Sequence, residues 1–229
     1  MPKATWDNLP PGKRARVMDA ALAEFARHGF SSGSLNVIAR EAGVAKGSLF
    51  QYFDDKLDLF ATACEECSLR VRDHMAAALE RHGAGEADFW ALLRVAAMDW
   101  VAYFRDHPVD RGVTFASNFE IDPQVRSAVR RVTNRHYTEV LTPLIKLAAD
   151  RGELRADADH AQLLAYLLLL LPHLALAPFG PELDPALGLY GKDPEQLTAP
   201  VHGLVGALER AFGPVNHVPD QQRPERTAR

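Results

Sequence analysis

Apolar side chains recur every three or four residues along most of the chain, which places them on one face of an α-helix. The first such stripe contains Val17, Ala21, Leu22 and Phe25, and Gly29 follows it as a stop signal. Runs that alternate between apolar and polar residues and are rich in Val, Ile and Thr are nearly absent. The pattern therefore predicts an all-α protein.

The same spacing predicts about nine helices. Two short helices follow the first, one starting with Ser34 as N-cap and stopping at Gly43, the next running from about Lys46 to Phe53. The other helices are expected over residues 55–82, 87–106, 109–118, 123–151, 158–177 and 195–212. The Pro- and Gly-rich connection 180–193 predicts an ordered arm or lid, and the polar, proline-punctuated segment 214–229 predicts a disordered tail.

Two short helices joined by residues 43–45 match the plan of a helix-turn-helix, in which a tight turn with Gly joins a supporting helix to a recognition helix. At 100° per residue, Leu49 and Phe53 face the domain core. Gly47 and Gln51 lie on the opposite side and point outward. The spacing alone leaves open a small helical subdomain whose polar residues are merely solvated.

The outward face suits the major groove of DNA. Gly47 lets the backbone approach closely, and Gln51 can pair with an adenine edge through two hydrogen bonds. Phosphate contacts would position the protein, whereas Gln51 and its neighbours would specify the sequence. The residues suited to phosphate or base-edge contacts lie on the flanks of the helix and just beyond it: Lys46, Ser48, Tyr52 and Lys56.

Charge and cysteine content narrow the class of protein. The net charge is −4, but residues 1–53 carry +3 and the remainder −7, which predicts a basic polyanion-binding unit on an acidic body. The first residues contain no apolar segment of a secretory signal, which with two cysteines favours a cytoplasmic location. Cys64 and Cys67 lack a second pair for zinc, so we interpret them as buried or half-buried thiols rather than a metal or redox site.

Residues 20–30 and 33–60 resemble the DNA-binding domain of the TetR family of transcriptional regulators. The specific motif is Ile-Ala-x-x-Ala-Gly-Val-x-Lys-Gly, then Leu-x-x-Tyr-Phe and Lys, within a match over about residues 11–60. The resemblance implies a helix-turn-helix domain over 1–56 and a larger helical effector-binding and dimerisation domain over 57–213. The expected DNA contacts are Ser34, Asn36, Lys46, Gly47, Ser48, Phe50, Gln51, Tyr52 and Lys56.

Two positions depart from the family pattern. Ala45 stands where the family usually has Ser or Thr, and loss of that helix cap costs about 1 kcal/mol. Phe50 stands where the family usually has Tyr, whose hydroxyl often meets a phosphate. We therefore expect the DNA backbone to be held differently here.

Residues 163–179 are apolar almost all round. Such a run could be a membrane-spanning helix or a helix buried inside the protein. It is short for a membrane span, contains Pro172-His173 and has acidic flanks, so a helix buried on every side is favoured. The resemblance implies that the last two helices pack against their mates in a homodimer. Such a dimer would set two recognition helices ~34–36 Å apart on a pseudo-palindromic operator of double-stranded DNA.

The resemblance also implies an effector pocket among the middle helices. Because Pro172 frees the carbonyl of Leu168, His173 becomes a candidate polar contact, although aromatic stripes at this spacing are often plain core. A small hydrophobic effector, no cofactor, no metal and no catalytic residues are expected. The leading hypothesis is a repressor relieved by that effector; the alternative is a DNA-binding factor controlled by a protein partner or by no ligand. Candidate effector contacts are Trp100, Tyr103, Phe104, Phe115, Phe119, His136, Tyr137, Leu141 and His173.

Overall fold

The computed structural model describes residues 2–83 and 86–214, and these contain helices and no strand. The all-α prediction is confirmed. Ten helices are present in this part of the chain, one more than expected. They are α1 (Ala4–Asp7), α2 (Pro11–Ser32), α3 (Leu35–Glu41), α4 (Lys46–Tyr52), α5 (Lys56–Arg81), α6 (Phe89–Asp106), α7 (Pro108–Asn118), α8 (Pro123–Asp150), α9 (His160–Leu176) and α10 (Pro194–Phe212).

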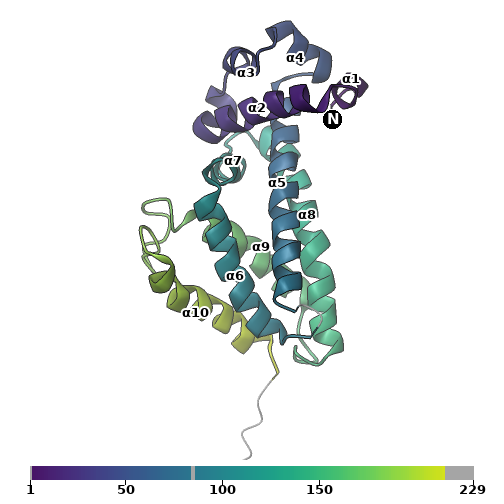
Figure 1. Cartoon of the computed structure of the whole chain (residues 1–229). Coiled ribbons are helices and arrows are strands. Elements are labelled where there is room, and N and C mark those ends of the chain that lie inside the picture. Colours follow the sequence, from purple (N-terminus) through teal and green to yellow (C-terminus); the bar gives the residue numbers. More distant parts are fainter. Residues whose placement is uncertain (1, 84–85, 215–229) are drawn as a thin grey trace, which may run out of the picture.

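The small helices α1, α3 and α4 lie with α2 at one end of an elongated molecule (Figure 1). The long helices α5 and α8 run side by side away from that end, and α6, α9 and α10 complete the body. Helix α7 lies directly beneath α2 and packs against it. The small helices thus reach the body mainly through α2, which contacts both α5 and α7.

Five of the six helices in the body begin with an aspartate at the N-cap, whereas α7 follows His107 without a side-chain cap. The side chains of Asp55, Asp88, Asp122, Asp159 and Asp193 each accept a hydrogen bond from a backbone N–H in the first turn of the helix that follows. Such bonds satisfy donors that have no partner within the helix. Five helix boundaries are therefore determined locally and agree with the predicted ones to within a few residues.

Gly29 and α1 are the two places where the N-terminal helices differ from the expected ones. Gly29 has a φ of 66°, so the regular helix stops there as predicted, although helical turns resume as far as Ser32. The short helix α1 was missed because four residues give no periodic pattern. Trp6 of α1 is 6% exposed and belongs to the core.

Helix α9 is buried on one face rather than on every side. Leu163, Leu167 and Leu174 are almost fully buried, whereas Leu169 is 72% exposed and Tyr166 51% exposed. Within a single chain only one face is covered; the prediction of burial on every side depended on a second subunit and stays a prediction. Within the described residues no helix is long and apolar enough to cross a membrane.

The connection between α9 and α10 is packed against the body. Leu189 is fully buried, and the N–H of Gly191 donates to the carbonyl of Pro178 at 3.1 Å. Asp184 accepts from two backbone N–H groups of its own turn and lies 3.3 Å from His173 Nε2. The expected ordered arm is present; the predicted tail lies outside the described residues except for Pro214, and the domain limits stay predictions.

Candidate DNA-binding site and internal cavities

The turn between α3 and α4 has the geometry that a helix-turn-helix requires. Gly43 has a φ of 65°, and the N–H of Val44 donates to the carbonyl of Ala39 at 2.9 Å, closing the end of α3. Ser34 caps α3, because its hydroxyl accepts from the N–H of Val37 at 3.4 Å. The buried carboxylate of Glu24 in α2 accepts from the N–H of Ser34 at 2.9 Å, a link between helices that the sequence pattern did not reveal.

Helix α4 has a buried side and an open side. Leu49 and Phe53 are each 2% exposed, as the helical spacing predicted. Lys46, Gly47 and Gln51 are exposed on the other side. A Cβ added at Gly47 would meet no atom within 4 Å, so nothing inside the protein requires a glycine there.

The remaining positions of the expected DNA surface divide into accessible and partly covered groups. Asn36 is exposed and Phe50 is 44% exposed, whereas Ser34 and Ser48 are half-buried. Ala45 precedes α4 without a side-chain cap, as its lack of a hydroxyl predicted. The exposed side chains of α3 and α4 that were expected to contact DNA therefore comprise several polar groups and one aromatic ring.

Tyr52 does not lie on the open side of α4. It is 5% exposed, and its ring centroid lies 6.1 Å from that of Trp6. The ammonium group of Lys13 lies 5.9 Å from the centre of the Tyr52 ring. The expectation that Tyr52 presents itself to DNA from the flank of the helix is wrong in this structure, because α1 covers that flank.

Lys56 is half-buried and bonded within the protein. Its Nζ donates to the carbonyl of Ser31 at 3.1 Å and lies 4.9 Å from the centre of the Phe30 ring. Burial lowers the pKa of Lys56, and the charges of Glu120 and Glu24 oppose that shift. Lys56 therefore ties α5 to the end of α2, and a phosphate would have to share its ammonium group with these contacts.

The N-terminal segment closes the C-terminal end of α4. Lys3 donates twice, from Nζ to the carbonyl of Phe50 at 2.9 Å and from its backbone N–H to that of Tyr52 at 2.8 Å. The hydroxyl of Thr5 donates to the carbonyl of Gln51. These three carbonyls have no partner within the helix. The sequence pattern did not predict this clamp. Trp6, an isolated tryptophan in a polar stretch, was the one signal from which it could have been inferred.

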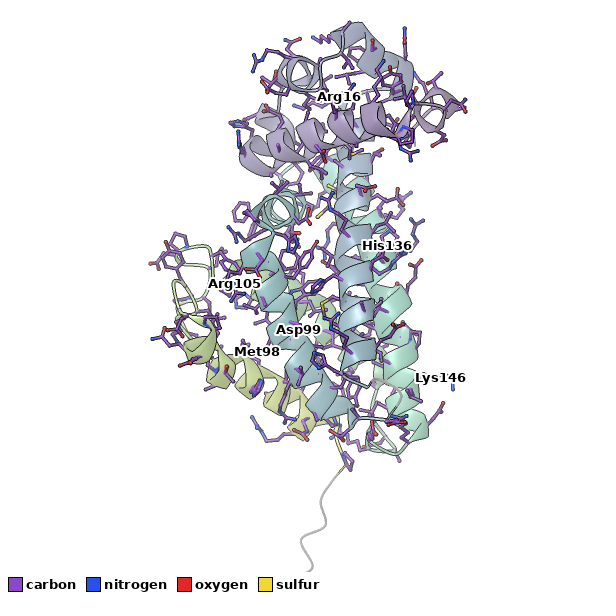
Figure 2. All side chains as sticks on the ribbon, in the orientation of Figure 1. Arg16, Met98, Asp99, Arg105, His136 and Lys146 are labelled. Carbon is purple, nitrogen blue, oxygen red and sulfur yellow. The ribbon has the colours of Figure 1, made fainter. Side chains whose placement is uncertain are left out.

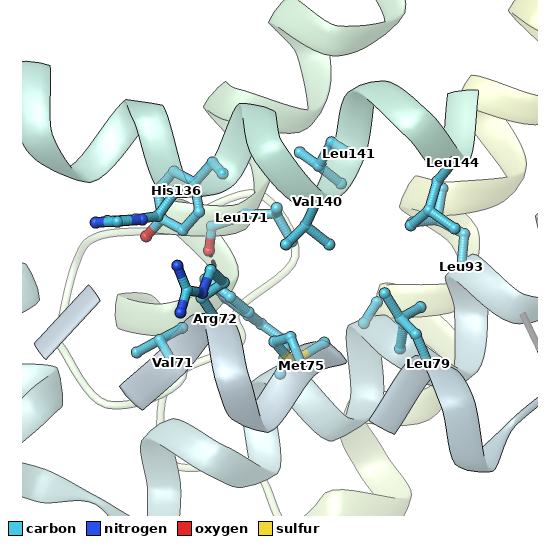
Figure 3. Close-up of a pocket in the computed structure, with 14 residues that line it drawn as sticks. Val71, Arg72, Met75, Leu79, Leu93, His136, Val140, Leu141, Leu144 and Leu171 are labelled. Carbon is cyan, nitrogen blue, oxygen red and sulfur yellow. Dashed lines mark hydrogen bonds between the residues drawn. The ribbon is translucent and has the colours of Figure 1, made fainter. Parts of the chain in front are cut away.

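An apolar cavity lies in the body between α5, α6, α8 and α9. Its volume is about 60 Å³. Figure 3 shows Arg72 and His136 at one end and Leu79, Leu93 and Leu144 at the other. We call it the apolar cavity; its lining residues are Val71, Arg72, Met75, Leu79, Leu93, Ala96, Ala97, Trp100, His136, Tyr137, Val140, Leu141, Leu144 and Leu171.

Polar groups at the Arg72 end are mostly paired with one another. The Nδ1 of His136 lies 3.2 Å from Glu139, and Arg72 lies 3.7 Å from the same carboxylate. The Nε2 of His136 is buried without a hydrogen-bond partner among the described residues. At the other end of α8, Lys146 projects away from the body (Figure 2).

Four of the nine candidate effector contacts line the apolar cavity: Trp100, His136, Tyr137 and Leu141. The other five lie elsewhere. Phe104 is fully buried against Trp100, and Phe115 is 46% exposed and packs on Phe119 at the surface. Phe119 and His173 border a separate hollow at the end of α7, and Tyr103 donates to Asp110 at 2.6 Å beside a cleft under α2. The nine residues do not form one site, because helical spacing gives a face but not the neighbour it meets, and their role as effector contacts stays a prediction.

A second, much smaller space lies between α5, α7 and α8. Its volume is about 10 Å³, roughly what one water molecule needs. We call it the polar chamber; its lining residues are Cys64, Cys67, Ser68, Val71, Val113, Thr114, Ser117, Thr133 and Tyr137. Both cysteines are free and buried, as predicted, and burial raises the pKa of each thiol. The described residues contain no cluster that could hold a metal ion.

The contact between α2 and α7 couples the small helices to the body. A Cβ on Gly112 of α7 would lie 2.6 Å from the carbonyl oxygen of Ala26 in α2, so the two helices touch closely there. Beside this contact, Asp110 accepts hydrogen bonds from Arg70 of α5 and Tyr103 of α6. A shift of α7 would therefore be passed directly to α2.

The open side of α4, held beyond a left-handed turn at Gly43, defines an all-α protein with a helix-turn-helix DNA-binding domain. Residues 17–63 match the family model described as bacterial regulatory proteins, tetR family. Over 57 residues the chain is 40% identical to the HTH-type transcriptional repressor SCO4008 of Streptomyces coelicolor. This alignment covers 25% of this chain and 30% of that protein. The alignment thus spans less than a third of the relative's length.

Solved structures match over most of the chain. The crystal structure of a candidate TetR-family transcriptional regulator from Mesorhizobium loti MAFF303099 aligns with a TM-score of 0.68 and 19% identity, covering 90% of this chain and 100% of that one. FadR from Bacillus subtilis, in complex with stearoyl-CoA, aligns with a TM-score of 0.66 and 17% identity. This alignment covers 83% of this chain and 96% of that one. These identities show a shared fold. The family model and the repressor alignment show that the DNA-binding domain of this chain is of the TetR family.

Proposed function

We propose that the protein is a homodimeric transcriptional repressor that binds a pseudo-palindromic operator and is released by a small hydrophobic effector. The observation that carries the proposal is the apolar cavity, which is lined by α5, a helix that contacts α2 at the DNA-binding end, together with α6, α8 and α9. Its volume of about 60 Å³ equals only a few water molecules, so an effector must enlarge it. Enlargement would displace α5 and its neighbours, which changes the spacing of the recognition helices.

Operator reading is assigned to α4. Gln51 is exposed on its open side and can pair with an adenine edge, while Lys46 at its first turn can meet phosphate. Selection of bound sequences from random DNA tests these roles. We expect Gln51→Ala to change the selected sequence, and Lys46→Ala to weaken binding to every sequence and reduce the salt dependence. An unchanged selected sequence with Gln51→Ala would remove Gln51 from the recognition surface.

Effector control is tested by filling the cavity. Val140 lines the apolar cavity from α8, and Val140→Phe would occupy much of its volume. We expect this variant to bind the selected operator normally and to lose release by apolar compounds, measured by fluorescence anisotropy. Val95→Phe, on a residue that is 40% exposed on α6, is the matched control and should keep the response.

The small cavity volume also favours a second candidate, a DNA-binding factor controlled by a protein partner or by no ligand. A panel of uncharged apolar compounds separates the two candidates. Release of operator DNA by some members supports the repressor with a hydrophobic effector. If no compound stabilises the protein against heat or releases DNA, the second candidate stands.

A further inference from the structure

Buried polar side chains gather at one point of the body. Of the eight buried polar or charged residues in the described part of the chain, Ser68, Thr114, Ser117 and Thr133 all line the polar chamber. They come from three helices, α5, α7 and α8. Burying hydroxyl groups costs free energy unless they are bonded, so each of them needs a hydrogen-bond partner.

Three of these four hydroxyl groups already donate their proton to a backbone carbonyl. Ser68 donates to the carbonyl of Cys64 at 2.7 Å, and Thr133 donates to that of Val129 at 3.0 Å. Ser117 donates to the carbonyl of Thr114 at 3.0 Å. A hydroxyl has one proton to donate and two lone pairs that accept, so these groups offer mainly acceptors to the chamber.

Tyr137 and Val71 separate the polar chamber from the apolar cavity, since both residues line both spaces. The ring of Tyr137 packs edge-on against Trp100, with the ring centroids 5.7 Å apart. Burial raises the pKa of Tyr137, and the neighbouring Cys67 thiol adds to the shift, so it stays a neutral phenol. Rotation of this ring would join the two spaces into one site with an apolar and a polar end.

We propose that the effector is an uncharged amphiphile with one hydroxyl group, which donates into the polar chamber while its hydrocarbon part fills the apolar cavity. This inference rests on the proposed function and specifies the chemistry of its ligand. An ionised carboxylate only accepts hydrogen bonds, and no Lys, Arg or His is among the described residues that line the chamber. The two basic side chains of the apolar cavity, Arg72 and His136, already face Glu139. An ammonium group would meet no carboxylate there. Both charged heads are therefore disfavoured.

The chamber also places the ligand head against the helix that moves the DNA-binding end. Thr114 and Ser117 belong to α7, and Gly112 of the same helix touches Ala26 of α2. A hydroxyl group is about as large as the one water molecule for which this space has room, so the carbon that carries it must push the walls apart. Occupation of the chamber would therefore shift α7 against α2, whereas a ligand confined to the apolar cavity touches α5, α6, α8 and α9 but not α7.

Ligands of one size test the chemistry of the head. 1-Octanol and 1-methoxyheptane have the same atoms, but only the alcohol donates a hydrogen bond; octanoate and octylamine supply the charged heads. We expect 1-octanol to bind at least about tenfold more tightly than the other three, since a site built for a hydroxyl leaves its acceptors unpaired without one. Tryptophan fluorescence measures binding, because Trp100 lines the apolar cavity, and anisotropy of labelled operator measures release.

The double variant Ser68→Ala, Thr133→Val removes two acceptors at nearly constant volume. We expect it to bind 1-octanol no more tightly than 1-methoxyheptane; Thr142→Val, on the exposed side of α8, is the control and should keep the difference. If the double variant does not fold, Ser117→Ala serves instead and should reduce the difference severalfold.

Equal binding of alcohol and ether by the unaltered protein would overturn the hydroxyl assignment while leaving a hydrophobic effector in place. The assignment would also be overturned if the double variant still bound 1-octanol more tightly than 1-methoxyheptane. Tighter binding of octanoate or octylamine would overturn it as well. If none of the four binds and the wider panel of apolar compounds also releases no DNA, the proposed effector control itself fails.

Discussion

At the scale of single residues, Gly47 is the least expected side chain in α4. A glycine inside a helix costs roughly 0.5–1 kcal/mol relative to alanine, and here neither a positive φ nor a close neighbour requires it. Its Cα lies on the open side between Lys46 and Gln51. We infer that the requirement comes from outside the protein, from DNA that approaches the backbone of α4.

Gly47→Ala should separate stability from DNA binding. We expect the free energy of unfolding to stay the same or rise by about 0.5–1 kcal/mol, because alanine favours the helix, while operator affinity falls. Denaturant titration and fluorescence anisotropy measure the two effects. Ser127→Ala on the exposed side of α8 is the control and should leave affinity unchanged. Undiminished affinity with Gly47→Ala would show that DNA does not approach this position closely.

His74 gives the protein a pH-dependent stability. Burial lowers its pKa, Arg81 and His107 lower it further, and Asp99 opposes them. Because the unfolded chain takes up this proton first, stability should fall as the pH drops through about 6.5 and stop falling below the folded-state pKa. We expect His74→Gln to lose less stability between about pH 7.5 and 5.5, measured by thermal unfolding. An identical loss would exclude His74 as a source of that dependence.

At the scale of elements, α1 and α4 form one unit. The last carbonyls of α4 are bonded by Lys3 and Thr5, and Trp6 covers Tyr52 and Phe53, with ring centroids 4.8 Å apart for Trp6 and Phe53. A seven-residue helix is too short to be stable alone, so such external bonds determine how well it is ordered. The family model begins at residue 17, which places this clamp outside the shared core of the domain.

Trp6→Ala should therefore weaken DNA binding more than it weakens the fold. Without its anchor α1 detaches, and the affinity falls in proportion to the fraction of molecules that keep α4 ordered. We expect operator affinity to fall by at least about fivefold in anisotropy titrations, which corresponds to the loss of about 1 kcal/mol, the contribution of one hydrogen bond. The body should unfold at nearly the same denaturant concentration. Tyr190→Ala, on a residue that is 56% exposed in the connection before α10, should alter neither quantity.

At the scale of the whole molecule, α9 and α10 leave an uncovered apolar face. Leu169 and Tyr166 project from α9, and α10 adds small exposed residues at Ala199, Gly203 and Ala207. Small residues allow helices to approach closely, and a second copy of the same face would cover the exposed leucine. This face is the one that the proposed homodimer would bury.

Leu169→Glu should separate the two subunits of that dimer. A carboxylate buried opposite its own copy is strongly unfavourable, so we expect a monomer in sedimentation experiments. Operator affinity should then fall by at least about a hundredfold, because the two half-sites no longer bind as one unit. Leu147→Glu, on a residue that is 36% exposed on α8, is the control. A Leu169→Glu protein that remains dimeric would place the interface elsewhere.

The helices from α2 onward, the turn at Gly43 and the two sides of α4 could be predicted from the sequence alone. These are local properties: an N-cap aspartate, a left-handed glycine and a 100° rotation per residue act within a few positions of the chain. Leu49 and Phe53 are buried as the spacing predicted. The motif around α3 and α4 was enough to assign the family.

Which helix faces pack against one another became known only from the tertiary structure. Tyr52 is buried because α1, distant in sequence, covers it, and five of the nine candidate effector contacts lie outside the apolar cavity because periodicity does not name a helix's neighbour. The polar chamber likewise exists only where α5, α7 and α8 converge. Contacts between residues far apart in the chain depend on how complete helices pack, and no local pattern contains that information.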